Sequence, residues 1–174
     1  GEFTFRMRPA GAHAADAPMP EGTAGDGASR YIEVHNKGSM LSFGQPTFRF
    51  EHLNGADKRT GRFDYELFEV IPDDAVNADG VRWDAATADQ KLAGGFAKQG
   101  MTYDSTRFVA RVNLTLQDSP IKRTGGTEAL VATITYYQVT GLNEQGVWTG
   151  SDNDLTPVEP TPGGADRVEF HNTY

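Results

Sequence analysis

Residues 62–70, RFDYELFEV, decide the fold class, because their apolar side chains recur at every second position. Phe63, Tyr65 and Leu67 fall on one face of this segment, as expected for a half-buried β-strand. Glu69 continues the same apolar row. A carboxyl group among buried aromatic rings costs free energy unless a partner compensates for the lost water. The stretch therefore predicts a strand that carries a buried acid.

A polar residue also interrupts an apolar row near the end of the chain. In residues 167–174, RVEFHNTY, the side chains of Val168, Phe170, Asn172 and Tyr174 share one face of an expected strand. A buried carboxamide that finds no hydrogen-bond partner destabilises a fold by roughly 1–3 kcal/mol. Asn172 therefore needs a partner, as Glu69 does.

Alternation and turn-forming residues predict short strands through most of the chain. We expect strands at 3–8, 30–36, 46–53, 62–70, 106–118, 128–139 and 167–174, with Phe48 and Phe50 inward and 128–139 central in a sheet. One short helix is expected after Asp84, ending at Gly94–Gly95, and long loops at 9–29 and 141–166. About seven strands with one short helical insertion indicate an all-β, Ig-like β-sandwich.

Composition excludes several classes of protein. The 174 residues suffice for one domain, and the absence of cysteine excludes disulfides and thiolate chemistry. A net charge of −8 argues against nucleic acid as a partner. No apolar run approaches the ~20 residues of a membrane span. The chain opens directly on a strand-like pattern, so we interpret it as a mature or excised segment without a signal peptide.

No metal or other cofactor is expected. The histidines lack the spacing of a metal site, and they are scattered through the chain at His13, His35, His52 and His171. The acidic loops lack the ordered ligand spacing of a calcium site.

Glu69 and Asn172 together suggest one specific reaction. Burial raises the pKa of a carboxyl group, so a neutral Glu69 can donate a hydrogen bond to an amide oxygen. A lysine amine held beside Asn172 in the same dry surroundings would be uncharged and could attack the amide carbon, releasing ammonia. Two simpler explanations stay open: the two side chains only hydrogen-bond each other, or the strand register is shifted by one residue.

Several segments resemble the isopeptide-forming domains of Gram-positive pilins and adhesins, of the streptococcal pilin linkage type. These segments are GEFTF (1–5), DAPMPEG (16–22), GRFDYELFEV (61–70), GMTYDSTRFVARVNLTL (100–116) and VEFHNTY (168–174). The resemblance implies a single CnaB-type β-sandwich over residues 1–174, with Glu69 as the catalytic acid and Asn172 as the isopeptide acceptor. We expect an apolar surround made by Phe3, Phe5, Phe63, Tyr65, Leu67 and Phe170.

The reacting lysine is the one part of this pattern that the chain lacks. The resemblance implies a lysine on a first strand, about a dozen residues before the segment similar to GEFTF. The lysines present, at Lys37, Lys58, Lys91, Lys98 and Lys122, follow no such motif. We therefore expect the lysine-bearing strand to come from an upstream segment or from a separate peptide, which would pair with an open sheet edge.

The function expected from these features is structural. The chain is interpreted as a stalk or adhesin module of an extracellular Gram-positive surface protein or pilus, joined to neighbouring domains. Its chemistry is one self-catalysed crosslink, so it is not an enzyme with turnover. The alternative is an adhesin module that binds a sugar or a host protein through its long loops, with Trp148 and Tyr31 as candidate ligand contacts.

Overall fold

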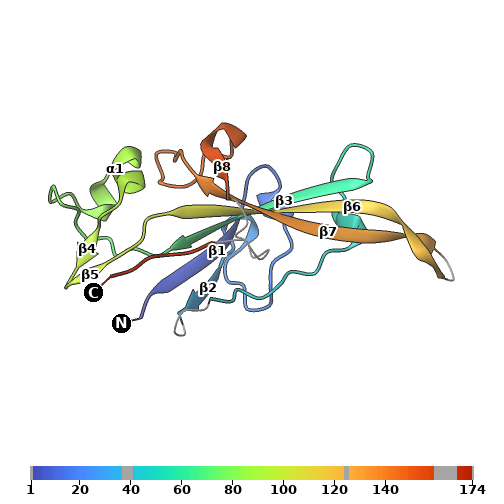
Figure 1. Cartoon of the computed structure of the whole chain (residues 1–174), viewed down its shortest axis with the longest axis horizontal. Helices are drawn as coiled ribbons and strands as arrows, with labels where there is room; N and C mark the ends of the chain where they lie inside the picture. Colours follow the sequence, from blue (N-terminus) through green and yellow to red (C-terminus); the bar gives the residue numbers. More distant parts are fainter. Residues whose placement is uncertain (1, 37–40, 124–125, 159–167, 174) are drawn as a thin grey trace.

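A sheet of six antiparallel strands runs the length of the molecule, as the computed structural model shows (Figure 1). It describes residues 2–36, 41–123, 126–158 and 168–173, apart from the side chains of residues 119–123, 126 and 127. The strand order is β2-β1-β3-β6-β7-β8. The strands are β1 (Thr4–Ala10), β2 (Ile32–His35), β3 (Thr60–Glu69), β6 (Arg107–Arg123), β7 (Gly126–Val139) and β8 (Leu155–Pro157).

The remaining elements are short. β4 (Ala97–Lys98) and β5 (Met101–Thr102) form a separate two-stranded sheet, and α1 spans Ala88–Ala93. Single 3-10 turns occur at Ala14–Asp16, Gly27–Ser29, Phe50–His52, Trp83–Ala85 and Asp152–Asp154. None of the helices in the described part of the chain has the length and apolar character needed to cross a membrane.

The inner face of the large sheet forms the core. β3 pairs with β6 so that Phe63 lies opposite Val112 and Leu67 opposite Phe108, which brings apolar side chains together in rows. Irregular segments cover this face with Leu53, Phe43, Phe48, Val168 and Phe170. The predicted all-β, sandwich-like fold is confirmed, although the second layer consists largely of non-strand segments.

Several predictions about individual elements are wrong. Residues 46–53 form no strand, and Phe50, expected inward, is 59% exposed because a 3-10 turn starts there. The helix begins after Thr87 and not after Asp84: the Thr87 hydroxyl is the N-cap and accepts a hydrogen bond from Gln90 N. The closing segment is extended, but its only bridge among the described residues joins Thr173 to Thr102.

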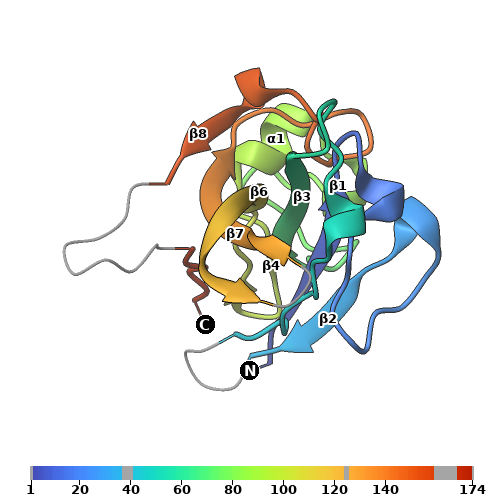
Figure 2. The same ribbon diagram turned by 90° about the vertical axis from the view of Figure 1, so that its right-hand side faces the viewer.

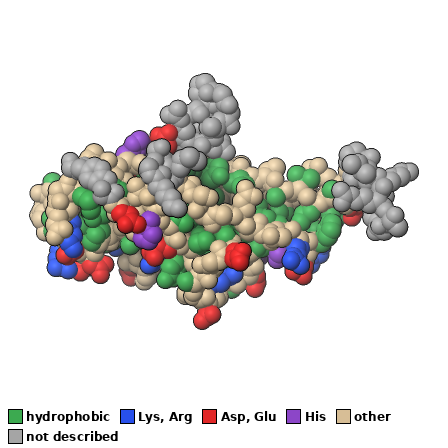
Figure 3. Space-filling view, turned by 90° about the horizontal axis from the view of Figure 1, so that it is seen from below, with side chains coloured by type: hydrophobic (Ala, Val, Ile, Leu, Met, Phe, Trp, Pro, Cys, Tyr) green, Lys and Arg blue, Asp and Glu red, His purple; other side chains and the backbone are tan. Residues whose placement is uncertain are grey.

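β7 is less central than expected. It pairs with β6 along most of its length but with β8 only at residues 137–139. Ile134 is consequently 49% exposed. The β6–β7 hairpin projects from the rest of the molecule (Figure 1), and hydrophobic side chains appear at its surface (Figure 3).

The outer face of the sheet buries charges. The side chains buried there are Asp64, Glu66, Arg107 and Arg111, each at most 7% exposed. Trp148 packs over this face against Ala10, Val109 and Val139. Viewed along the long axis, β8 and β2 lie on opposite sides of the molecule (Figure 2).

Candidate functional site

Glu69 and Asn172 meet at one end of the inner face. Asn172 Nδ2 donates to both carboxylate oxygens of Glu69, at 2.7 Å to Oε1 and 2.8 Å to Oε2. Glu69 is the last residue of β3 and is 3% exposed. The same Nδ2 lies 3.4 Å from the carbonyl oxygen of Thr102. Two side chains separated by 103 positions in the chain thus hydrogen-bond each other.

Asp104 connects the acid to the segment that bears the amide. Its backbone N–H donates to Glu69 Oε2 at 3.1 Å. Its carboxylate accepts a 2.6 Å hydrogen bond from the backbone N–H of His171, the residue before Asn172. Two hydrogen bonds from one residue therefore hold the acid and the amide-bearing segment in register.

Aromatic rings enclose the pair. Phe3 is 4% and Phe5 is 3% exposed. Phe5 packs on Phe170 with ring centroids 5.0 Å apart, and Phe3 meets Tyr103 edge-on at 5.8 Å. These rings shield the Glu69 side of the contact from water, whereas Asn172 is half-buried and borders a groove.

The other members of the expected surround lie in the main core. Phe63, Tyr65 and Leu67 share the inner face of β3 with Glu69, but they belong to the cluster around Phe108 and Val112. Strand geometry places Phe63, six residues away, about 20 Å from Glu69.

Burial makes Glu69 an unusual acid. Desolvation raises its pKa from 4.5 to about 7, against the lowering effect of the hydrogen bonds from Asn172 and from the Asp104 N–H. The negative charge of Asp104 adds to the increase in pKa. Glu69 can thus exchange a proton near neutral pH, which suits general acid–base work.

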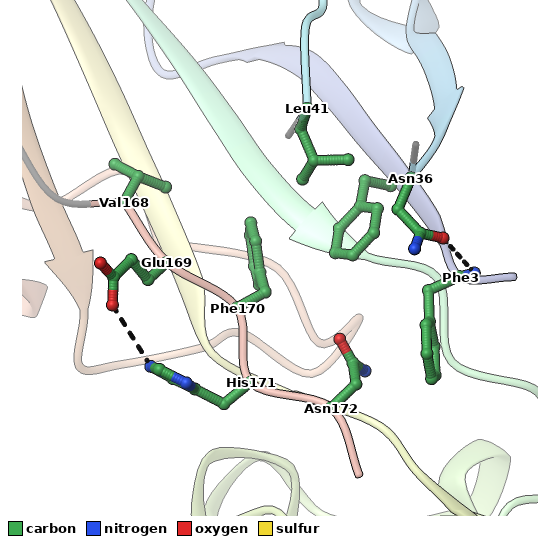
Figure 4. A pocket seen from close by; sticks show the side chains of 9 residues that line it. Phe3, Asn36, Leu41, Val168, Glu169, Phe170, His171 and Asn172 are labelled. Atoms are coloured by element: carbon green, nitrogen blue, oxygen red, sulfur yellow. Dashed lines mark hydrogen bonds and ion pairs between the residues drawn. The ribbon is translucent and has the colours of Figure 1, made fainter. Parts of the chain in front are cut away.

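A groove of about 390 Å³ opens beside Asn172. Its walls are Phe3, Phe5, Asn36 and Leu41 on one side and residues 168–172 on the other (Figure 4). Glu169 and His171 point away from the groove and pair with each other at 3.6 Å.

One backbone edge of the closing segment has no neighbouring strand within the described part of the chain. Thr173 pairs with Thr102, and the His171 N–H donates to Asp104. Alternate residues of an extended chain direct their backbone groups to opposite sides. Phe170 and Asn172 therefore direct theirs away from Thr102, and among the described residues neither backbone N–H has an acceptor.

The candidate ligand contacts lie on the outer face of the sheet. Trp148 is only 4% exposed, and its ring N–H donates to the carbonyl of Ser151. Its environment is that of a core residue. Tyr31 is half-buried, and the guanidinium of Arg6 lies 4.2 Å from its ring centroid.

The lysines whose contacts are known are engaged elsewhere. Lys98 Nζ pairs with Asp74 at 2.9 Å, and Lys91 lies over the ring of Trp83. Lys37 and the side chain of Lys122 lie outside the described residues.

Two contributors to the site were not identified from the residue pattern alone. Thr102, in β5, contacts Asn172, and Asp104, in the segment that follows β5, contacts Glu69. Both lie in the GMTYD stretch that supported the family resemblance, so that motif was the available signal. Periodicity does not reveal them, because they lie at the end of a two-residue strand and beyond it.

Comparison with known proteins gives one finding. The family model described as "FctA: Spy0128-like isopeptide containing domain" matches residues 1–174. A search of curated proteins and of solved structures found no significant match.

Proposed function

Because the chain belongs to the family of Spy0128-like isopeptide-containing domains, we propose that Glu69 and Asn172 are the acid and the acceptor of a Lys–Asn isopeptide bond. Domains of this family are structural units of pilins rather than enzymes, and their bond forms autocatalytically. The observation that carries the proposal is the contact of the buried Glu69 carboxylate with the Asn172 amide. The family resemblance noted in the sequence is confirmed.

The chemistry follows from the position of the amide. Its nitrogen faces the Glu69 carboxylate, so Glu69 is placed to protonate the leaving group. The Lys Nζ bonds to Asn172 Cγ, the Cγ–Nδ2 bond breaks, and Nδ2 leaves as ammonia. Glu69 accepts the proton that the lysine loses and delivers it to Nδ2, so the acid is regenerated.

The orientation of the Asn172 amide differs from the one expected from the sequence. The expectation was that a neutral Glu69 donates a hydrogen bond to the amide oxygen. The arrangement found is the one favoured by an ionised carboxylate and by the Thr102 carbonyl, both of which accept from Nδ2. Glu69 then acts at the nitrogen, as a proton carrier, rather than at the oxygen.

We place the lysine on an extended strand in the groove beside Asn172. Apolar and polar side chains line the groove, and the backbone N–H groups of Phe170 and Asn172 face away from Thr102 without acceptors among the described residues. A strand added there would satisfy these groups and bury its own apolar side chains against Phe3 and Phe5. Either an upstream segment or a separate peptide could supply it.

The bond would make the domain a load-bearing unit. The family belongs to Gram-positive surface pili, whose domains join neighbouring domains of the same fibre. We assign this chain the same extracellular, cell-wall role. Force on the first and last strands would then pass through the covalent bond instead of the hydrogen bonds of the sheet.

Intact mass spectrometry tests the proposal. The chain bonded to a lysine-bearing strand, whether an upstream segment or an added peptide, should be lighter than the summed sequence mass by one ammonia, about 17 Da. Glu69→Gln and Asn172→Ala should restore the full mass. Glu128→Gln and Asn153→Ala change an exposed acid and an exposed amide and should still lose ammonia.

Peptide mapping of the same samples identifies the bonded residues. A branched peptide that contains Asn172 is expected. A bond that persists in Asn172→Ala, or a branch at another residue, would overturn the assignment.

A further inference from the structure

A hollow of about 300 Å³ lies on the outer face of the sheet, among β1, β3 and the loop that precedes β2. Its lining includes Arg6, Arg8, Arg30, Tyr31 and Phe68. Three guanidinium groups around one hollow repel one another, and the chain as a whole carries a net charge of −8. We propose that this hollow binds a phosphate or sulfate group.

The local charges leave an excess of positive charge. Arg6 pairs with Glu33 at 3.1 Å. Glu66 pairs with two arginines. Arg8 Nε lies 3.4 Å from its Oε1, and Arg107 Nε donates a hydrogen bond to its Oε2. The backbone N–H of Trp148 also points at the Glu66 carboxylate. One carboxylate is thus shared by Arg8 and Arg107, and half of their combined charge is unmatched.

Arg30 adds a cation that has no counter-ion in the described part of the chain. Its Nε donates to the carbonyl of Gly27 at 2.7 Å, and its Nη2 donates to the carbonyls of Ala14 and Ala15, each at 3.1 Å. These carbonyls hold the guanidinium in place without neutralising it. A ligand would therefore meet a cation that is already ordered, which lowers the entropic cost of binding.

Hydrogen-bond donors remain available at the hollow. Arg8 makes no hydrogen bond to any described residue, since its buried Nε forms only the 3.4 Å ion pair with Glu66 Oε1. The Tyr31 hydroxyl makes no hydrogen bond to any described residue. The Arg6 guanidinium stacks on the Tyr31 ring with 4.2 Å to its centroid. The planar fork of an arginine matches the oxygens of phosphate and sulfate, and its charge strengthens each bond.

The size of the hollow allows more than a free ion. Small-molecule sites in proteins begin at about 300 Å³, which is enough for an anion and a small attached group. Phe68 gives the hollow an apolar wall. An ester of phosphate or sulfate therefore fits the hollow as well as the inorganic ions do.

The proposed anion site is independent of the isopeptide chemistry. Arg6 and Arg8 alternate along β1 with Phe5 and Met7, which face the core, so the hollow and Glu69 lie on opposite faces of the sheet. A failure to form the crosslink would not affect anion binding, and a failure to bind anions would not affect the crosslink.

NMR titration of the labelled full-length protein tests the site. The probes are inorganic phosphate, inorganic sulfate and glycerol 3-phosphate, each against sodium chloride at matched ionic strength. Saturable shifts are expected at Tyr31 and at the backbone amides of residues 28–31. Glycerol 3-phosphate separates the two sources of the anion: binding as tight as that of phosphate indicates an ester, and much weaker binding indicates a free ion.

Variants decide whether the hollow is responsible. Arg8→Gln should weaken binding about tenfold, as expected for one lost charge-assisted interaction. Tyr31→Phe removes only the hydroxyl and keeps the fold, and it should weaken binding severalfold. Arg82→Gln removes an equal charge from the exposed Arg82–Asp84 pair and should bind like the wild type.

The proposal fails on any of three results. The first is that the shifts rise linearly with anion concentration. The second is that Arg82→Gln weakens binding as much as Arg8→Gln does. The third is that Arg8→Gln and Tyr31→Phe both bind with wild-type affinity.

Discussion

At the scale of single residues, the site depends on how Glu69 is held. Its carboxylate accepts two hydrogen bonds from Asn172 and one from the Asp104 N–H, yet desolvation still raises its pKa to about 7. An ordinary exposed glutamate would be fully ionised at neutral pH and would donate no proton to a leaving amine. Burial, more than any one contact, thus suits Glu69 to proton transfer.

The pKa of Glu69 predicts a pH-dependent stability in the uncrosslinked protein. A raised folded-state pKa means that the folded state binds more protons than the unfolded state between pH 4.5 and about 7. The stabilisation is complete below pH 4.5 and is lost as the pH rises through 7, with a slope of at most about 1.4 kcal/mol per pH unit. The free energy of unfolding, measured with denaturant across this pH range, should fall with this slope in the wild type and should stay flat by comparison in Glu69→Gln. Parallel pH profiles would contradict the raised pKa.

Asp104 is predicted to act as a positioning residue. Asp104→Ala removes the acceptor of the His171 N–H, so it should slow bond formation. Asp104→Asn keeps an acceptor oxygen but removes the negative charge, so it should retain most of the rate and lower the pKa of Glu69. Crosslinking time courses and carboxyl NMR titrations measure the two effects. Equal rates for Asp104→Ala and the wild type would exclude this role.

At the scale of elements, the outer face of β3 is held by buried ion pairs. Glu66 is fully buried, bonds Arg107 and lies beside Arg8, while Arg111 pairs with Asp64 at 2.8 Å. Burial lowers the pKa of Arg107 despite the opposing effect of Glu66. This network covers the face of the sheet opposite the proposed isopeptide site and fixes the strand that presents Glu69.

Loss of the shared carboxylate should be costly. Glu66→Gln leaves the buried Arg107 and the partly buried Arg8 without a counter-ion, and it should destabilise the fold by about 3–5 kcal/mol. Glu33→Gln breaks the more exposed Arg6–Glu33 pair and should cost less than about 1 kcal/mol. Equilibrium denaturation of both variants measures the difference. Similar losses would show that burial does not set the strength of these pairs.

At the scale of the whole molecule, the proposed bond would connect a first strand to Asn172 across nearly the entire chain. A crosslink that closes so long a loop restricts the unfolded state and is worth about 5 kcal/mol in the loop-entropy description. For a protein of this size, such a gain corresponds to a rise in Tm of roughly 10–20 °C. With no cysteine in the chain, no disulfide can supply this stabilisation.

Calorimetry checks the predicted gain. The crosslinked protein should unfold roughly 10–20 °C above Glu69→Gln, which keeps the fold but cannot form the bond. Any effect of Glu69→Gln on the fold itself is measured against freshly prepared, uncrosslinked wild-type protein. Equal Tm values for the crosslinked and uncrosslinked proteins would contradict a stabilising role for the bond.

Much of the fold and the central pair of the site could be predicted from local patterns. Strands β1, β3 and β6 follow from the alternation around Phe5, Phe63 and Phe108, because side chains of a strand alternate between faces whatever the rest of the chain does. Glu69 and Asn172 stood out because each is a polar residue in an apolar row. Residues 46–53 also alternate but form a turn, since alternation does not say whether a neighbouring strand is available for pairing.

The sequence by itself determined that strands dominate the chain and that an acid and an amide interrupt its apolar rows. Only the tertiary structure decided that Glu69 and Asn172 touch across 103 positions, that Asp104 holds them together, and that arginines gather at one hollow. The physical reason is the range of the forces involved. The period of a strand is set by neighbouring peptide units, whereas contacts across a sheet depend on register and loop paths that the whole chain settles together.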